Sequence, residues 1–185
     1  MDIPPMSPFR TARLLLRRAE AADAAPLAAL MTDAISARLA TWSMPWTAER
    51  MAARIAEWSP IGLPCAVERA SDGALVGWVH ALRARDGPER ATMGWWCAEA
   101  HRGHGYLREA ASALLPLAVS LLDLRVVEAG VQPDNAASLA VMRALGMQLV
   151  GERVVLAPAR QRQERILLFA IGREAALATR PAPPA

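Results

Sequence analysis

Two histidines, an arginine and two glycines stand together in the segment HRGHGYLREA, which begins at His101, and these residue types can support chemistry. Gly103 and Gly105 allow backbone conformations that other residues avoid. The residues after them favour helix, so the segment reads as a loop that leads into a helix. Backbone N–H groups at such a helix start lack partners and attract anions, and Arg102 adds positive charge beside them.

Other interpretations of this loop have to be weighed. His101 and His104 form an HxxH pair and His80 is a third histidine, but no cysteine or carboxylate cluster accompanies them, so we expect no metal site. A dinucleotide-binding G-x-G-x-x-G loop would need a glycine where Arg108 stands. The segment can also be a turn that only connects a strand to a helix, although such a turn does not require Arg102. The residues alone favour a phosphate-containing ligand.

The elements that position this loop follow from hydrophobic periodicity. Strands are predicted over residues 12–19, 65–70, 74–83, 90–98, 125–132, 147–156 and 165–172. Helices are predicted between them, one after the loop and one over residues 133–146. This order predicts an α+β fold, a mixed sheet with helices packed on it. Pro116 lies inside the helix after the loop, and we expect it to kink that helix or end it early.

Composition limits the function classes. The 185 residues predict a single domain over 1–185, with Pro-rich flexible ends at about 1–9 and 176–185. All 21 Lys and Arg residues are arginine, which excludes a Schiff-base lysine and a GK[ST] phosphate loop. The net charge of +3 is spread along the chain, so we expect no nucleic-acid surface. Without a long apolar run or signal sequence, we expect a cytoplasmic chain that does not bind a membrane, with Cys65 and Cys97 buried.

Four segments together resemble one known family. HRGHGYLREA is similar to the central Q/R-x-x-G-x-G/A motif of the GCN5-related N-acetyltransferase (GNAT) superfamily. With the preceding GWWCAEA, it resembles the ribosomal-protein N-terminal acetyltransferase-like (RimJ/RimL-type) branch. VQPDNAASLAVMRALGM and RTARLLLRRAEAADAAPL resemble two further motifs of that branch. The matches run from about Thr11 to Gly172.

The resemblance implies a GNAT fold: a mixed, mostly antiparallel sheet of six to seven strands, about four helices, and a V-shaped splay between two central strands. It implies acetyl-CoA as the donor. The pyrophosphate would be held by the backbone amides of His101, Arg102, Gly103, His104, Gly105 and Tyr106. The pantetheine arm and the acetyl group would be lined by Trp95, Trp96 and Cys97, and Gly94 is compatible with a bulge there.

The resemblance also implies residues at the reacting end. Asn135 would contact the CoA arm, although capping a helix is an alternative role for it. Ser138 would lie near the thiol and either protonate or orient the departing thiolate, and we favour the orienting role. A backbone N–H at Trp96 would polarise the thioester carbonyl.

The acceptor end is less defined. Thr92 stands where many relatives have a glutamate that is proposed as the base. His80, Glu128 or no dedicated base at all are the alternatives. Trp46 is expected to form a wall of the acceptor pocket, whereas core packing explains Trp42 at least as well.

The function implied is transfer of an acetyl group from acetyl-CoA to a primary amine, by direct attack in a ternary complex. The amine would belong to a small molecule or to a peptide N-terminus. The alternatives are a catalytically inactive relative that binds CoA or regulates a partner, and an interaction domain that binds neither substrate. A homodimer is compatible with the sequence.

Overall fold

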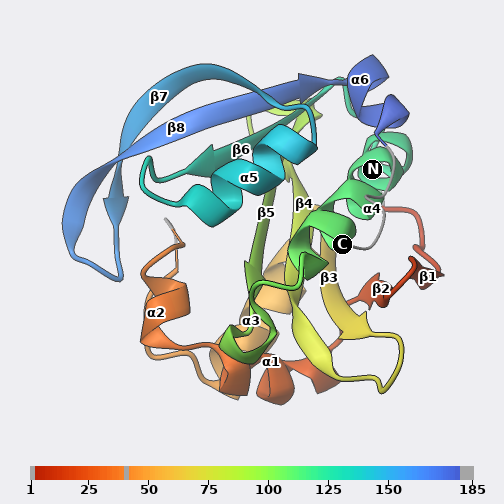
Figure 1. Ribbon diagram of the computed structural model, residues 1–185, viewed down its shortest axis with the longest axis vertical. Helices are drawn as coiled ribbons and strands as arrows, with labels where there is room; N and C mark the ends of the chain where they lie inside the picture. Colours follow the sequence, from red (N-terminus) through yellow and green to blue (C-terminus); the bar gives the residue numbers. More distant parts are fainter. Residues whose placement is uncertain (1–2, 40–41, 180–185) are drawn as a thin grey trace.

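Over residues 3–39 and 42–179, which the structure describes, the computed structural model shows an eight-stranded sheet and six α-helices (Figure 1). The strands are β1 (Phe9–Arg10), β2 (Leu14–Arg18), β3 (Gly62–Arg69), β4 (Leu75–Ala84), β5 (Gly87–Cys97), β6 (Val126–Val131), β7 (Gln148–Ala157) and β8 (Arg162–Gly172). The helices are α1 (Ala24–Leu30), α2 (Asp33–Ser36), α3 (Ala48–Trp58), α4 (Tyr106–Leu121), α5 (Ala136–Ala144) and α6 (Arg173–Ala178). Short 3₁₀ turns are η1 (Ala21–Asp23) and η2 (Glu99–His101).

The strands lie in the order β1-β2-β3-β4-β5-β6-β8-β7. Each neighbouring pair is antiparallel except β5 and β6, which are parallel. The predicted α+β fold with a mixed, mostly antiparallel sheet is therefore confirmed. Its eight strands and six helices over the described residues exceed the expected numbers, because β1 has two residues, α2 has four and α6 has six. Segments that short leave no periodic pattern in a sequence.

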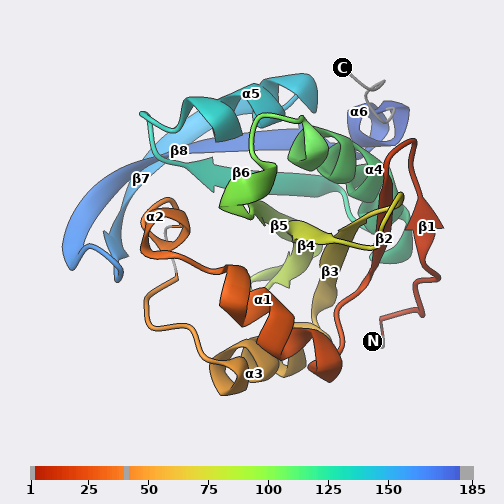
Figure 2. The same cartoon turned by 60° about the horizontal axis from the view of Figure 1, so that its bottom comes forward.

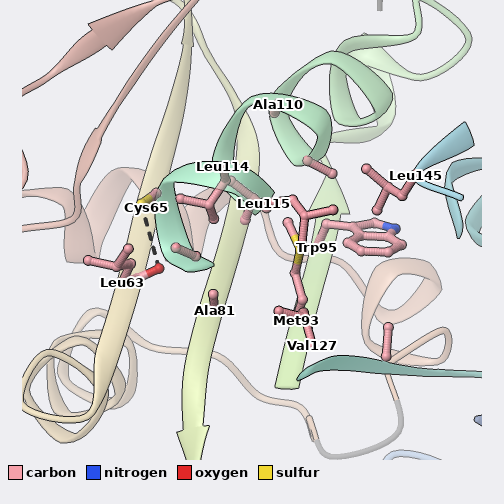
Figure 3. Close-up of a cluster of buried hydrophobic side chains, with 14 of the residues drawn as sticks. Leu63, Cys65, Ala81, Met93, Trp95, Ala110, Leu114, Leu115, Val127 and Leu145 are labelled. Atoms are coloured by element: carbon pink, nitrogen blue, oxygen red, sulfur yellow. Dashed lines mark hydrogen bonds between the residues drawn. The ribbon is translucent and has the colours of Figure 1, made fainter. Parts of the chain in front are cut away.

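Helices cover both faces of the sheet. Helices α1, α2 and α3 lie on one face, and α4, α5 and α6 lie on the other (Figure 2). Figure 3 shows Leu114 and Leu115 of α4 between Cys65 on β3 and Trp95 on β5, in the larger buried cluster. The other face holds a second buried cluster that is rich in tryptophan. Among the described residues, no helix is long and apolar enough to cross a membrane.

The sheet opens between its two parallel strands. β5 and β6 pair only where Arg90–Thr92 lie beside Val126–Glu128, and both strands continue beyond that point. The backbone of Met93–Cys97 pairs with β4 on one side and is not paired with β6 on the other. The predicted V-shaped splay is confirmed.

Gly94 does not form the expected bulge. It pairs with His80 on β4 in regular register, so that expectation is wrong and the splay comes from the divergence of β6. Gly94 is required for another reason: a Cβ there would lie 2.6 Å from Cε1 of His80. The imidazole occupies the space that a side chain would need.

One further expectation needs correction. α4 runs through Pro116 to Leu121, so an early end at the proline is wrong, and burial of most residues before it stabilises the helix despite the lost donor. The flexibility of the two chain ends stays a prediction; within those ends Met6 and Ala176, which is part of α6, are buried. Residues 1–2 and 180–185 of those segments lie outside the described residues.

Candidate functional site

A cavity of about 820 Å³ lies at the splay. Its walls come from the end of β5, the glycine loop with the start of α4, the start of α5, and α2. Ten of the eleven residues that the sequence assigned to the cofactor line it: Trp95, Trp96, Cys97, His101, Arg102, Gly103, Gly105, Tyr106, Asn135 and Ser138. Residues that are up to 43 positions apart in the sequence thus meet around one space.

The glycine loop has the backbone geometry of an anion site. Gly103 and Gly105 have φ angles of +80° and +74°, in the left-handed region that favours glycine. A Cβ on Gly103 would meet no heavy atom within 4 Å, so its backbone angle, and not crowding, calls for glycine. Gly105 is the N-cap of α4, whose first N–H groups have no acceptor within the helix. Those groups and the helix dipole favour a negatively charged ligand.

Not all backbone N–H groups of the glycine loop are free to bind an anion. The His101 N–H donates to the Ala98 carbonyl at 2.9 Å, and the Arg102 N–H donates to the Glu99 carbonyl at 3.2 Å. These two amides form the η2 turn, which corrects the expectation that the anion-binding amides begin at His101. The set that can face an anion begins at Gly103.

His104 is the cofactor-assigned residue that does not line the cavity. Its ring stacks on Tyr106, with centroids 5.5 Å apart and planes within 11°. Its Nδ1 lies 2.9 Å from the Arg102 carbonyl oxygen, a donor contact. His104 therefore shapes the loop from outside. Among the described residues, no three His, Cys, Asp or Glu side chains are grouped so that they could hold a metal ion.

A buried carboxylate ties the loop to the start of β2. Glu109 is 1% exposed and accepts hydrogen bonds from Thr11 Oγ1, from the Arg13 N–H at 2.9 Å and from Arg13 Nε at 2.7 Å. Burial alone would raise the pKa of Glu109, but the hydrogen bonds from Thr11 and Arg13 outweigh it and lower that pKa. The carboxylate is therefore ionised and holds Arg13 in place.

Arg13 is a candidate site residue that sequence reasoning missed. Its guanidinium lies 5.0 Å from the centre of the Tyr106 ring. One of its terminal nitrogens is 3.6 Å from the point where a Cβ on Gly105 would lie. The available signal was the family-like opening motif at Thr11 and Arg13, which the structure connects to the loop helix through Glu109.

Asn135 caps a helix and also lines the cavity. It is the N-cap of α5, and its Oδ1 accepts from the Ser138 N–H at 3.2 Å. The two roles weighed for Asn135 are therefore compatible, since the amide nitrogen stays available to a ligand. Ser138 follows in the first turn of α5 and also lines the cavity.

The direction of the β5 backbone decides which amides face the splay. The Ala98 N–H donates to the Val76 carbonyl on the β4 side at 2.9 Å. N–H groups of alternate residues in a strand point the same way, so the Trp96 N–H also faces β4. The N–H groups of Trp95 and Cys97 point toward the open side. This geometry does not support the expected oxyanion role of the Trp96 backbone, because its N–H is directed at β4.

The three acceptor-side residues lie outside the cavity wall. Trp46 is 8% exposed and packs on Trp42 with ring centroids 4.5 Å apart, which is a core position. Glu128 pairs with Arg90 at 2.8 Å, where β5 and β6 are still joined. Neither side chain is brought to the reacting end of the cavity.

His80 is held as a neutral side chain within the tryptophan cluster. Its Nδ1 accepts from Trp78 Nε1 at 3.0 Å, and its ring lies 4.5 Å from that of Trp58. Burial and the nearby charge of Arg54 lower the pKa of His80 to about 3. A base with that pKa takes almost no proton from an ammonium group near pH 7.

Helix α2 supplies a wall that the sequence patterns did not indicate. Ile35, Arg38 and Leu39 line the cavity from this segment, and Arg108 does so from α4. Thr32 caps α2, and its hydroxyl also donates to Glu99 at the start of the loop. A capping threonine was the signal available, but four helical residues give no periodicity to support it.

The chain thus has a splayed α+β sheet with a glycine loop and a cavity at its opening. The sequence matches the acetyltransferase (GNAT) domain family over residues 13–148, and the chain belongs to this family.

Known proteins share parts of the sequence or the whole fold. A Bacillus subtilis protein described as the probable N-acetyltransferase YjcK is 34% identical over 83 residues, which is 44% of this chain and 46% of that protein. RimJ from Mycobacterium smegmatis, solved with CoA-disulfide, superposes with a TM-score of 0.77 at 22% identity, over 92% of this chain and 90% of its own. The ribosomal-protein-S5-alanine acetyltransferase from Vibrio fischeri superposes with a TM-score of 0.78 at 17% identity, over 91% of this chain and 98% of its own. The spermidine N-acetyltransferase from Vibrio cholerae, solved with CoA and spermine, superposes with a TM-score of 0.77 at 17% identity, over 90% of this chain and 99% of its own.

Proposed function

We propose that this protein binds acetyl-CoA in the cavity at the splay and transfers the acetyl group to a primary amine by direct attack in a ternary complex. The amine belongs to a small molecule or to a peptide N-terminus, and the reaction takes place in the cytoplasm. The observation that carries the proposal is the meeting of the loop, the unpaired edge of β5 and the start of α5 around one cavity.

The residues present fit acetyl-CoA. The free amides from Gly103 onward suit a pyrophosphate, with positive charge from Arg102, Arg108 and Arg13 nearby. The backbone of Met93–Cys97 is open toward β6 and can pair with the amide groups of an extended arm. A cavity of about 820 Å³ is large enough for the arm and the acetyl group. Acetyl-CoA supplies an activated thioester at the end of that arm.

The chain's own groups then assist the transfer. The backbone N–H of Cys97 or Trp95 donates to the thioester oxygen as negative charge develops on it. Ser138 orients the departing sulfur from the first turn of α5. Burial raises the pKa of the Cys97 thiol to about 11, so this cysteine is a neutral wall and not a nucleophile at pH 7. That favours direct attack by the amine over an acyl-enzyme.

No dedicated base is required in this proposal. His80 is neutral with a pKa of about 3, and Glu128 is paired with Arg90 away from the cavity wall. The neutral fraction of the acceptor amine, which is present in solution, attacks directly. The rate is then expected to rise with pH as the amine loses its proton.

Release of CoA thiol in the presence of acetyl-CoA and a panel of amines tests this function. The panel contains peptide N-termini, aminoglycosides and polyamines. We expect thiol release that depends on one class of amine and matches the amount of acetylated product. Binding of acetyl-CoA without release from any amine would instead favour the catalytically inactive relative.

A further inference from the structure

A second cavity of about 640 Å³ lies between α2 and the hairpin of β7 and β8. It shares two wall residues, Arg38 and Asp134, with the cavity at the splay, so the two spaces adjoin. In Figure 1, α2 lies close to the turn that connects β7 and β8. A molecule that fills the second cavity therefore lies next to the first one, on the side formed by Arg38 and Asp134.

Arginine dominates the lining of the second cavity. Four arginines and two carboxylates line it: Arg38, Arg160, Arg162, Arg165, Asp134 and Glu164. Arg38 pairs with Asp134 at 2.9 Å, and Arg165 pairs with Glu152 outside the lining. Glu164 is shared by Arg160 and Arg162, so one carboxylate balances two guanidinium groups. The lining keeps an excess of positive charge.

The arginines retain donors for a ligand. Among the described residues, Arg162 donates only through Nε, to Glu164 at 2.8 Å, and a guanidinium has five N–H donors. Its side chain is 70% exposed. An incoming anion can therefore share this guanidinium with Glu164, whose own side chain is 10% exposed.

A buried polar side chain supports this array from beneath. Gln132 is 5% exposed and lines the second cavity. In the amide orientation that satisfies both neighbours, its nitrogen donates to the Arg38 carbonyl at 3.1 Å and its oxygen accepts from Arg160 at 2.7 Å. Gln132 thus holds the α2 side and the hairpin side together, which fixes the positions of the positive charges.

We propose that the second cavity receives the acceptor, and that the acceptor is a primary amine that also carries carboxylate or phosphate groups. This inference rests on the proposed acetyl transfer and names its substrate class. Guanidinium groups bind carboxylate and phosphate oxygens in pairs of hydrogen bonds, which gives both affinity and orientation. The same charges repel a polyamine, so the arginines select against cationic acceptors.

Matched acceptors test the inference. Three peptides with a free alanine N-terminus and an amidated C-terminus differ only in the next two residues, which are glutamate, glutamine or arginine. Free glutamate and spermidine form the small-molecule arms. We expect kcat/KM for thiol release to be at least about tenfold higher for the acidic peptide, or for free glutamate, than for its neutral or basic counterparts. That preference shrinks as salt is added, because salt screens exposed charges.

Charge reversal at Arg162 tests whether the preference for the acidic acceptor comes from the second cavity. Arg162→Glu is expected to remove the preference for the acidic acceptor while the affinity for acetyl-CoA stays unchanged. Arg153→Glu is the matched control, because Arg153 is an exposed arginine on the same hairpin that does not line the cavity. This control is expected to keep the preference.

Two outcomes overturn the inference, and they differ. Equal or better use of the basic peptide and spermidine rejects an anionic acceptor while acetyl transfer stands. An absence of thiol release from every amine, in a protein that binds acetyl-CoA, rejects the proposed function and the inference with it.

Discussion

At the residue scale, Gly103 and Gly105 give the loop its shape. A valine at either position is strained by about 1–2 kcal/mol and disturbs the free amides, so we expect acetyl-CoA affinity to fall at least about tenfold. Gly73→Val is the matched control, because Gly73 has a φ of +73°, does not line the cavity and also has open space around it. Calorimetry and thermal melts compare the three variants. Equal affinity in all of them would mean that the loop only connects β5 to α4.

Glu109 is the residue on which the placement of Arg13 depends. Glu109→Gln removes the charge that binds Arg13, and we expect a loss of roughly 2–3 kcal/mol in the free energy of unfolding. Acetyl-CoA affinity should fall as well, since Arg13 lies beside Gly105. Glu152→Gln, at an exposed carboxylate paired with Arg165, is the control and should change neither quantity by much. Urea unfolding and calorimetry measure both, and unchanged affinity in Glu109→Gln contradicts the placement role.

His80 makes the stability depend on pH in a defined direction. Well above pH 6.5, the ordinary pKa of histidine, His80 is neutral in the folded and the unfolded chain. Below that pH the unfolded chain takes up a proton that the folded chain, with a pKa of about 3, does not. The free energy of unfolding therefore falls between pH 7 and pH 5, by about 2 kcal/mol from this residue.

Urea unfolding of His80→Gln at the two pH values checks this linkage. The variant should lose most of the decrease, whereas His104→Gln, which changes an exposed histidine, should keep it. The same decrease in wild type and His80→Gln would show that His80 is not buried as a neutral group.

At the element scale, β5 combines close packing on one face with an open edge. A methyl group on Gly94 would press on the His80 ring, so we expect Gly94→Ala to destabilise the protein by about 1–3 kcal/mol. Gly151→Ala on β7 is the control, since a Cβ there meets nothing within 4 Å. Adding His80→Ala should recover part of the loss in a double-mutant cycle. Additive losses would contradict the contact.

The elements around the loop are predictable because their signals are local. Glycines in the left-handed region, a helix start and the capping Asn135 can each be recognised from a few neighbouring residues of the sequence. The direction of the Trp96 N–H depends on pairing with β4, which no local pattern shows. The place of α2 depends on tertiary contacts such as Thr32 with Glu99, and four residues carry too little pattern to reveal it.

At the scale of the whole molecule, the cavity at the splay adjoins the second cavity, because Arg38 and Asp134 line both. The cavity at the splay is formed mainly by β5, α4 and α5, whose family motifs can be recognised in the sequence. The second cavity combines Arg38 from near α2 with Arg160 and Arg162 from the hairpin, which are more than 120 positions away. Long-range assembly of this kind has no sequence signature, and the predicted acceptor wall at Trp46 is instead part of the buried tryptophan-rich cluster.

Calorimetric titration of the wild-type protein with acetyl-CoA tests the central claim that the cavity at the splay is an acetyl-CoA site. We predict one binding site with a dissociation constant well below about 1 mM, which corresponds to more than ~4 kcal/mol of binding free energy. Binding should weaken in Gly103→Val and persist in Gly73→Val. An absence of binding at about 1 mM acetyl-CoA, in protein that melts cooperatively, would contradict the claim.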